Sequence, residues 1–409
     1  MKRYLLILFL LPFFNYSQAQ IEGCDGSRYI DDIFFEYKVT KGLKYGEGET
    51  IFGNFKELSL DVYEPANDEL SRRPVIILAF GGSFISGERG DLEFLCEAYA
   101  RKGYVAVTID YRLFDGPLLP LPSGEQMKNV VIKTVSDMKA AIRYMREDAD
   151  TDNLYRIDPN KVFVGGISAG SITAFHTAVL DDDDFFPADI AAIIESNGGL
   201  EGNTSDNFEY SSKVQGLVNF SGGLNDASWI DANDPPFVSI HDDKDGVVPY
   251  GAGFAMVFGF PIVYMEGSQI CNEVGDSVGV VNQLKTIEDS EGHVSYLFNP
   301  ADAEVNINYT ADFIAEIVCA DTPTDTEDLA STLESIAVFP NPTTGVISFS
   351  KYSDVDLEVE LLDIYGRKLN IYSSATSLDL NDYANGIYFV RITDTESDNS
   401  KTVKVVLER

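Results

Sequence analysis

The chain has 409 residues, a length that favours two or three domains. Apolar residues make up 44% and charged residues 23%, which is ordinary for a globular protein and excludes disorder along the whole chain. The 66 acidic and 30 basic residues give a net charge of −36, and this charge repels nucleic-acid phosphates and anionic lipid surfaces. The composition therefore excludes nucleic-acid binding.

The chain begins with the features of a secretory signal peptide. Lys2 and Arg3 precede an apolar stretch at residues 4–14, and a short polar segment ends in Ser-Gln-Ala at residues 17–19. About eleven apolar residues are too few to cross ~30 Å of hydrocarbon, which argues against a membrane anchor. We therefore expect residues 1–19 to be a cleaved signal peptide of an exported protein without an integral membrane segment.

Four cysteines follow the signal, and export would place them in an oxidising compartment, where an even number suggests two disulfides. They are Cys24, Cys96, Cys271 and Cys319. The sequence does not choose among the three pairings, and we favour Cys24–Cys96 and Cys271–Cys319, which would staple the N-terminal segment and a late helix. No Cys/His spacing is typical of zinc, so we expect neither a metal nor another cofactor.

Residues 20–319 alternate between short apolar runs and helical patterns. Runs typical of strands buried on both faces occur at residues 74–80, 104–110, 161–165, 214–220 and 236–241. Between them, residues 129–146 carry apolar side chains three and four positions apart, which predicts a helix. The alternation predicts an α/β fold with a mostly parallel central sheet flanked by helices.

The composition changes near residue 320. Residues 320–334 lack aromatic side chains and are rich in Thr, Asp and Glu, as expected of a solvated linker. Beyond it, residues 338–350, 355–365 and 387–393 show period-two alternation between turn signals. We expect the last 75 residues or so to form a small all-β sandwich.

A candidate nucleophile lies where a buried strand runs into a Gly-x-Ser-x-Gly turn. Residues 161–170 read KVFVGGISAG, and a helical segment follows. This strand–turn–helix setting is the one in which the motif presents a serine, here Ser168, above the sheet. The N–H of Ala169, at the start of the helix, would face a developing oxyanion. The alternative is a plain tight turn.

A serine nucleophile needs a base, and the chain has three histidines. His176, in the helix after Ser168, is predicted to be a packed core residue. His241, at the end of a buried strand, is predicted to support the loop that follows. His293 lies in a polar loop after the strand expected at residues 282–287, from which it can reach the serine as general base.

The base needs a carboxylate to hold its tautomer. Asp245 lies in HDDKDGVVPY after a buried strand, and the Val-Val-Pro that follows turns the loop toward the sheet, which favours Asp245 over Asp242 and Asp243. A calcium site in this acidic loop is the weaker alternative, because the ligand spacing of an EF-hand is absent. The order Ser168, Asp245, His293 is that of the α/β-hydrolases.

The first buried strand ends in AFGGSFISG at residues 79–87, where a glycine pair lets backbone N–H groups turn inward. This stretch resembles the HGGGFxxG loop of carboxylesterases related to hormone-sensitive lipase and the type-B esterases. The resemblance implies an oxyanion hole made by the N–H groups of Gly82, Ser83 and Ala169. Phe80 stands in place of the family histidine, a change that removes no N–H donor.

Further motifs follow in the family's order. DYRL at residues 110–113 resembles a structural motif of the same enzymes, and HDDKDGVVPY is similar to their HGxxDxxVPY acid loop, with Asp242 in place of glycine. Together the motifs span roughly residues 30–318. They imply that residues 20–319 form an α/β-hydrolase catalytic domain.

The tail resembles a different family. VFPNPTTG at residues 338–345, YGR at 365–367, NGIYFV at 385–390 and KTVK at 401–404 are similar, in this order, to the type-A C-terminal sorting domain of the type IX secretion system of Bacteroidetes. The resemblance implies that residues 335–409 engage the type IX secretion machinery. It also implies export across the outer membrane, followed by release or attachment at the cell surface. A β-sandwich binding module is the alternative.

The substrate pocket is expected from loops above the strand ends, at residues 199–212, 222–235 and 251–269. The second loop carries Trp229, which either lines the pocket or packs as core, and Phe84 is a further candidate contact. The third segment is rich in Phe, Met and Gly and favours an apolar lining. No basic residue stands out near the candidate catalytic residues, which favours a neutral ester.

These features predict a secreted serine carboxylesterase that works through an acyl-enzyme. Short-acyl or aryl esters, feruloyl or acetyl esters of polysaccharides, and polyesters are all open as substrates. A serine peptidase on the same fold is less favoured, because the glycine-rich loop resembles that of esterases and no propeller domain is present. A non-catalytic surface adhesion protein is the third hypothesis, against which the presence of all three catalytic residue types argues.

Overall fold

The computed structural model describes residues 23–320, 336, 338–349, 357–363, 367–373, 377–394 and 400–409. The signal peptide predicted at residues 1–19, and nearly all of the linker predicted at residues 320–334, lie outside these ranges. The described residues form two separate hydrophobic cores, one within residues 23–320 and the other in the C-terminal segment. None of the described helices combines the length and the apolar character that a membrane crossing requires.

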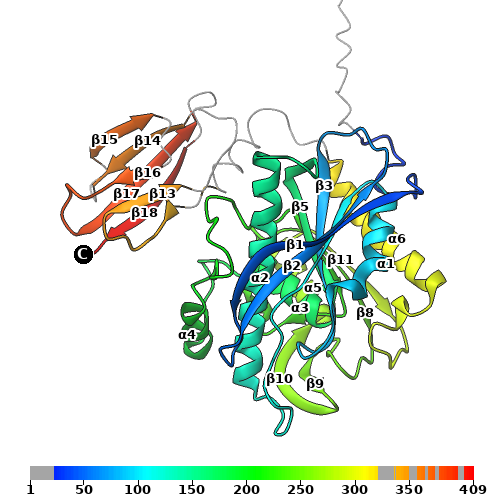
Figure 1. Cartoon of the computed structure of the whole chain (residues 1–409). Coiled ribbons are helices and arrows are strands. Elements are labelled where there is room, and N and C mark those ends of the chain that lie inside the picture. The colour runs from blue at the N-terminus through cyan, green and yellow to red at the C-terminus, as the bar shows by residue number, and fades with distance from the viewer. Residues whose placement is uncertain are drawn as a thin grey trace, which may run out of the picture.

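The larger unit is built on an eight-stranded sheet of order β1-β2-β4-β3-β5-β6-β8-β11 (Figure 1). Its first two pairings are antiparallel and the remaining five are parallel, so the predicted mostly parallel sheet is confirmed. The strands are β1 (Tyr37–Glu49), β2 (Phe55–Pro65), β3 (Arg73–Ala79), β4 (Val105–Ile109), β5 (Ile157–Ile167), β6 (Gly216–Phe220), β8 (Phe237–Asp242) and β11 (Asn282–Ile287).

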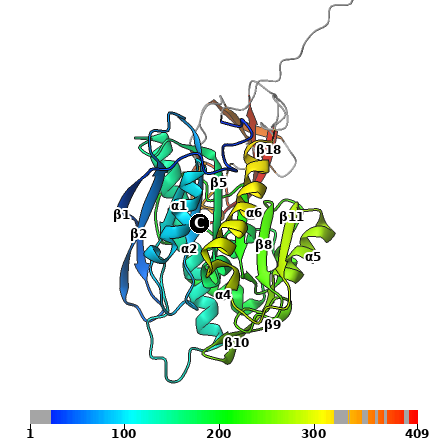
Figure 2. The same cartoon turned by 90° about the vertical axis from the view of Figure 1, so that its right-hand side faces the viewer.

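Helices cover both faces of this sheet, α1 and α6 on one side and α2 with α3 on the other (Figures 1 and 2). The helices are α1 (Glu93–Arg101), α2 (Gly124–Asp150), α3 (Ala169–Val179), α4 (Ala188–Ser196), α5 (Ser268–Val278) and α6 (Pro300–Val318), with short 3-10 turns η1 (Arg89–Leu92), η2 (Ala227–Trp229) and η3 (Ser295–Leu297). α2 begins before the predicted range, because Ser123 and Gln126 form a reciprocal capping box.

The topology brings the candidate site residues to one edge. Parallel strands have their carboxyl ends at the same edge of a sheet, and this is where open α/β sheets bind their ligands. β3 leads there into the glycine-rich loop and β5 into Ser168, while β8 leads into the loop of Asp245 and β11 into the loop of His293. Motifs that lie far apart in the sequence therefore converge.

A hairpin lies at the same edge of the central sheet, where its residues line a pocket together with Ser168. β9 (Ala252–Val257) and β10 (Phe260–Gly267) pair antiparallel, and β10 also pairs with the short β7 (Gly223–Leu224). This three-stranded sheet is separate from the central one and extends from its end (Figures 1 and 2). It accounts for the segment at residues 251–269, which the sequence predicted to be a loop of the substrate pocket.

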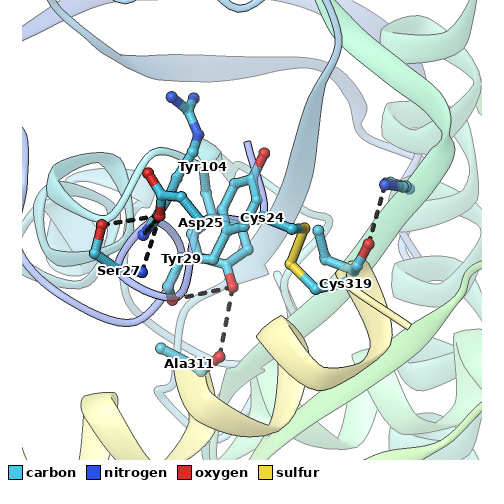
Figure 3. Close-up of a disulfide and its surroundings, with 10 residues drawn as sticks. Cys24, Asp25, Ser27, Tyr29, Tyr104, Ala311 and Cys319 are labelled. Atoms are coloured by element: carbon cyan, nitrogen blue, oxygen red, sulfur yellow. Dashed lines mark hydrogen bonds between the residues drawn. A yellow bond between two sulfur atoms is a disulfide. The ribbon is translucent and has the colours of Figure 1, made fainter. Parts of the chain in front are cut away.

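The disulfide pairing favoured from the sequence is wrong. Cys24 is bonded to Cys319, with the Cα atoms 5.6 Å apart (Figure 3). Cys96 and Cys271 are free thiols. Cys96 lies in α1 and Cys271 in α5, and both are enclosed in the core. The predicted disulfides Cys24–Cys96 and Cys271–Cys319 are therefore both absent, since Cys24 and Cys319 bond to each other.

The observed pair meets because two chain segments converge on α1. Near the start of the described chain, the Tyr29 N–H donates to the Lys102 carbonyl oxygen just after α1. From the other side, α6 packs on α1, where the Tyr99 and Thr310 hydroxyls lie 2.8 Å apart. The Tyr104 hydroxyl lies 3.3 Å from the Tyr29 carbonyl oxygen and 3.4 Å from that of Ala311 in α6, which joins the two segments (Figure 3).

In the described residues of the C-terminal unit, all pairs of named strands are antiparallel. Its two sheets have the orders β12-β13-β16 and β15-β14-β17-β18. The strands are β12 (Val338–Phe339), β13 (Val346–Phe349), β14 (Leu357–Leu362), β15 (Lys368–Ser373), β16 (Ser377–Asp379), β17 (Gly386–Asp394) and β18 (Ser400–Leu407). Side chains from both sheets share one core, among them Ile347, Leu378, Leu361 and Val390, so the small all-β unit predicted from the alternation is confirmed.

Candidate active site

Ser168 stands on a strained turn between β5 and α3. Its backbone has φ 54° and ψ −116°, a left-handed conformation that residues other than glycine rarely adopt. A Cβ atom on Gly170 would overlap the Ala79 carbonyl oxygen, and one on Gly166 would overlap the backbone of Gly170. Because β3 presses directly against the turn, only glycine fits on either side of the serine.

Ser168, His293 and Asp245 form a continuous chain of hydrogen bonds. His293 Nε2 lies 2.7 Å from Ser168 Oγ, and His293 Nδ1 lies 2.7 Å from Asp245 Oδ2. A charged carboxylate only accepts, so Nδ1 carries the proton and Nε2 accepts from the serine hydroxyl. In this arrangement a histidine can remove the serine proton during attack on a carbonyl.

The side chain of Asp245 is fully buried, and both oxygens of its carboxylate accept hydrogen bonds. Oδ1 accepts from the N–H groups of Val247 at 2.7 Å and Val248 at 3.1 Å. Oδ2 faces His293 and also His241, whose Nε2 is 3.3 Å away. Burial would raise the pKa of Asp245, but hydrogen bonds from His241 and His293 outweigh it and lower the pKa to about 2. The carboxylate therefore stays charged at neutral pH.

His241 is a second imidazole on Asp245, a contact that the sequence did not predict. Its Nε2 faces only acceptors, Asp245 and the Val248 carbonyl oxygen at 3.2 Å, so this nitrogen carries the proton. In the neutral ring Nδ1 then accepts from Ser268 Oγ at 2.7 Å. Ser268 Oγ in turn accepts from Asn219 Nδ2 at 2.9 Å. This buried network holds His241 in one orientation.

Asp242, the alternative acid, binds the serines on either side of His293 rather than its ring. Its Oδ1 accepts from Ser290 Oγ at 2.5 Å and from Ser295 Oγ, and its Oδ2 accepts from the Ser295 N–H at 3.1 Å. Val294, next to His293, has φ 57°, which is strained for a β-branched residue. Asp242 thus fixes both ends of a strained loop that carries the candidate base.

The three amides predicted for the oxyanion hole lie on segments that meet beside Ser168. A Cβ atom on Gly81 would come within 3.4 Å of Ser168 Cβ, so the glycine-rich loop passes next to the serine. Gly82 has φ 128° and Ser83 φ 54°. Within residues 23–320 the N–H groups of Gly82, Ser83 and Ala169 make no hydrogen bond, which leaves them available to a ligand oxygen.

Phe80 supports this loop in place of the histidine of similar enzymes. Its ring stacks on Tyr111 with centroids 4.2 Å apart, and the Tyr111 hydroxyl donates to the Phe80 carbonyl oxygen at 2.7 Å. A Cβ atom on Gly87 would strike the Phe80 ring. An apolar stack therefore holds the base of the loop.

An apolar pocket of about 860 Å³, including its open mouth, lies beside Ser168. Its walls come from α2, α3, α4, η2 and the β9–β10 hairpin, and both candidate contacts, Phe84 and Trp229, line it. Trp229 also packs on His176 and Phe186, so it both lines the pocket and belongs to the core. None of the described residues at 199–212 lines this pocket, contrary to the expectation for that segment.

The polar groups of the pocket wall carry little free charge. His176 donates from Nδ1 to the Ile172 carbonyl oxygen at 2.8 Å and accepts the Asn225 N–H at Nε2, 3.3 Å away. Burial lowers the pKa of His176 to about 4, so its ring is neutral at physiological pH. Lys128 also lines the pocket, and its Nζ lies 2.9 Å from Asp189. The wall therefore suits a neutral, apolar group.

Two helices contribute to the pocket wall, where the sequence predicts only loops. Met127 and Val131 of α2 and Ile190 and Ile193 of α4 line the pocket, whereas only loops had been considered. The signal was present in the ADIAAIIES segment, residues 188–196, whose apolar side chains exceed what one packed face needs. The periodicity of these apolar side chains does not show which of them face the pocket, because that depends on how the helix packs.

Comparisons with known families match both parts of the chain. Residues 60–225 match the BD-FAE family, and residues 337–408 match the secretion system C-terminal sorting domain. A probable isoprenylcysteine alpha-carbonyl methylesterase of Oryza sativa subsp. japonica is 31% identical over 138 residues, which is 34% of this chain and 28% of that protein. The quorum-quenching protein AidA of Acinetobacter baumannii (strain MDR-ZJ06) is 30% identical over 131 residues, 32% of this chain and 38% of that protein. The chain thus spans well under half the length of these curated relatives.

Among solved structures, esterase 2 of Thermogutta terrifontis is similar. Its apo form is 23% identical with a TM-score of 0.49, covering 68% of this chain and 94% of that one. The form phosphorylated by paraoxon is 22% identical with a TM-score of 0.49, covering 71% and 97%. The family matches and the sheet order show an α/β-hydrolase fold that contains the BD-FAE match, followed by a secretion system C-terminal sorting domain, which marks proteins exported by type IX secretion to the cell surface or outside.

Proposed function

We propose that this protein is a serine carboxylesterase that acts outside the cell on neutral esters with an apolar group. The observation that carries the proposal is the chain of 2.7 Å contacts from Ser168 through His293 to Asp245, placed at an apolar pocket. Two further observations support it. The amides of the glycine-rich loop are unoccupied within residues 23–320, and residues 60–225 match a family of esterase-like hydrolases.

The reaction follows from the protonation states at the site. Ser168 Oγ attacks the ester carbonyl carbon while His293 Nε2 takes the hydroxyl proton, and the charged Asp245 stabilises the imidazolium. The N–H groups of Gly82, Ser83 and Ala169 receive the negative oxygen of the tetrahedral intermediate. Collapse breaks the ester C–O bond, and the alcohol leaves with the proton from His293.

The acyl-enzyme is then hydrolysed by the same residues. His293 removes a proton from a water molecule, the resulting hydroxide attacks the acyl carbon, and Ser168 Oγ leaves with the proton returned by His293. Since the pocket wall is apolar and Lys128 is paired with Asp189, the enzyme is expected to accept an uncharged, apolar acyl or aryl group. The type IX secretion machinery is the proposed partner of residues 335–409.

Hydrolysis of 4-nitrophenyl butyrate by the full chain tests this proposal. Ser168→Ala and His293→Ala are each expected to lower kcat by about 10³-fold or more, the scale of triad substitutions in other enzymes. Ser277→Ala, on the exposed side of α5, is the matched control and should keep full activity. Undiminished activity in Ser168→Ala would refute the mechanism, and hydrolysis of the butyryl 4-nitroanilide with no action on the ester would favour a peptidase.

A further inference from the structure

The β9–β10 hairpin has two different apolar sides. Ala255, Met256, Val257, Ile262, Val263 and Met265 line the pocket beside Ser168. Outside the pocket lining lie four rings that are 54%, 68%, 59% and 48% exposed, Phe254, Phe258, Phe260 and Tyr264, called here the hairpin aromatics. Phe254 and Tyr264 are cross-strand partners with ring centroids 5.6 Å apart. The outer apolar face is therefore continuous with the pocket through a single hairpin.

The tip of the hairpin places a phenylalanine where folding favours another residue. Val257 pairs with Phe260, so Phe258 and Gly259 form a two-residue turn, with φ 51° and 80°. A turn with two positive φ angles prefers Asn-Gly, and a bulky aromatic residue at positive φ is an outlier. Local folding does not explain Phe258, and strain of this kind is typical of functional positions.

Twelve consecutive residues of the hairpin lack the polar groups found on ordinary protein surfaces. Residues 252–263 read AGFAMVFGFPIV and contain no charged or hydrogen-bonding side chain. Aromatic and Met residues without charge are the composition of interface cores. The net charge of −36 repels anionic membranes, so the surface that this hairpin fits is neutral as well as apolar.

We propose that the hairpin aromatics dock on the surface of a neutral, water-insoluble ester, so that the pocket opens directly onto the aggregated substrate. This proposal rests on the proposed esterase function and names the physical state of its substrate. A polysaccharide surface is disfavoured, because sugar hydroxyls need hydrogen-bond partners and the Tyr264 hydroxyl is the single polar group that the hairpin aromatics offer. Docking removes four exposed rings from water, and this burial drives adsorption.

The test compares dissolved and emulsified substrates with the full chain. The variant Phe258→Asn/Phe260→Ser should lose about tenfold or more of its rate on emulsified tributyrin, on the basis of ~25 cal/mol per Å² of apolar surface. Its kcat/KM on dissolved 4-nitrophenyl butyrate should stay within about twofold, because neither ring lines the pocket. Phe258→Asn alone should fold at least as stably as wild type, since Asn suits the turn. The matched control is Phe35→Ser/Phe55→Ser, which removes two rings, 85% and 63% exposed, that lie outside the pocket lining.

Adsorption separates this proposal from the esterase function itself. Ser168→Ala protein, which should not turn over, is expected to co-sediment with the tributyrin emulsion, and the added hairpin substitutions should abolish this binding. Equal losses on dissolved and emulsified substrates, or an unchanged rate on the emulsion, would overturn the docking proposal. So would hairpin-dependent adsorption to insoluble xylan without adsorption to the emulsion. A wild-type protein that hydrolyses neither ester would refute the esterase function. Its co-sedimentation with the emulsion would still test whether the hairpin aromatics dock.

Discussion

His241 Nε2 lies 3.3 Å from Asp245 Oδ2, the same oxygen that receives His293 Nδ1 at 2.7 Å. One carboxylate oxygen is thus shared by two imidazoles with different exposure, since the His241 side chain is fully enclosed and that of His293 is 22% exposed. The enclosed ring of His241 does not line the pocket. Its role is to hold the carboxylate that orients the other ring.

The first prediction concerns this positioning role. His241→Ala should lower kcat on 4-nitrophenyl butyrate about five- to tenfold with little change in KM, because one modest hydrogen bond, about 1 kcal/mol, is lost at Asp245. His241→Gln keeps a donor near the Nε2 position and should recover most of the rate. Steady-state kinetics check this result. Equal loss in both variants, or a rise in KM alone, would contradict it.

The second prediction ranks the two neighbouring acids. Asp245→Asn should lower kcat about 10³- to 10⁴-fold, because the amide cannot hold the required tautomer of His293. Asp242→Asn keeps one acceptor for the serines around His293 and should cost only about tenfold in kcat. Kinetics of the two purified variants at pH 8 give the comparison, and the reverse order would move the role of the acid to Asp242.

The third prediction concerns the turn of Ser168. Gly170→Ala places a methyl group on the carbonyl oxygens of Ala79 and Phe80 and should destabilise the fold by about 1–3 kcal/mol or more. Gly246→Ala is the matched control, because a Cβ atom there meets nothing within 4 Å. Urea denaturation followed by fluorescence measures both. Similar midpoints for the two variants would show that β3 does not confine the turn.

The fourth prediction is a pH dependence of stability. Burial raises the pKa of Asp234 to about 8, and the nearby charge of Asp231 acts in the same direction. An unfolded chain has an Asp pKa near 3.9. Between about pH 4 and pH 8 the folded state therefore holds a proton that the unfolded state has lost, so the free energy of unfolding falls as pH rises. Asp234→Asn mimics the protonated form and should leave Tm unchanged near pH 4 and raise it at pH 9.

The control for this prediction is Asp289→Asn, whose side chain is almost fully exposed. The difference in Tm between each variant and wild type, measured by calorimetry from pH 4 to pH 9, isolates the group in question. A gain for Asp234→Asn that does not grow with pH would contradict the raised pKa of Asp234.

The central sheet was predictable because a strand buried on both faces leaves an unbroken apolar run, as β3 and β4 do. The predicted residues Ser168, Asp245 and His293 are brought together for a related reason. Each follows or lies near the carboxyl end of a parallel strand, and those ends share one edge of the sheet. Motif spacing and strand order together were enough to locate them.

Features that depend on packing were not predictable. The partner of Cys24 was missed because it is set by how α6 lies along α1. The contact between His241 and Asp245 depends on a single rotamer held by Ser268, which leaves no periodic trace in the sequence. The contribution of α4 to the pocket wall was not predictable, because a helix face that lines a cavity has the same apolar sequence pattern as one that packs in the core.

The bond between Cys24 and Cys319 makes nearly the whole hydrolase domain one covalent ring of chain. A protease that cuts before Cys24 or after Cys319 removes a terminal segment and leaves that ring closed. A single cut inside the ring opens it but releases no fragment, because the two pieces stay linked through the sulfur atoms. Outside the cell, where proteases are common, the catalytic residues would thus remain on one molecule whether or not the sorting domain has been removed.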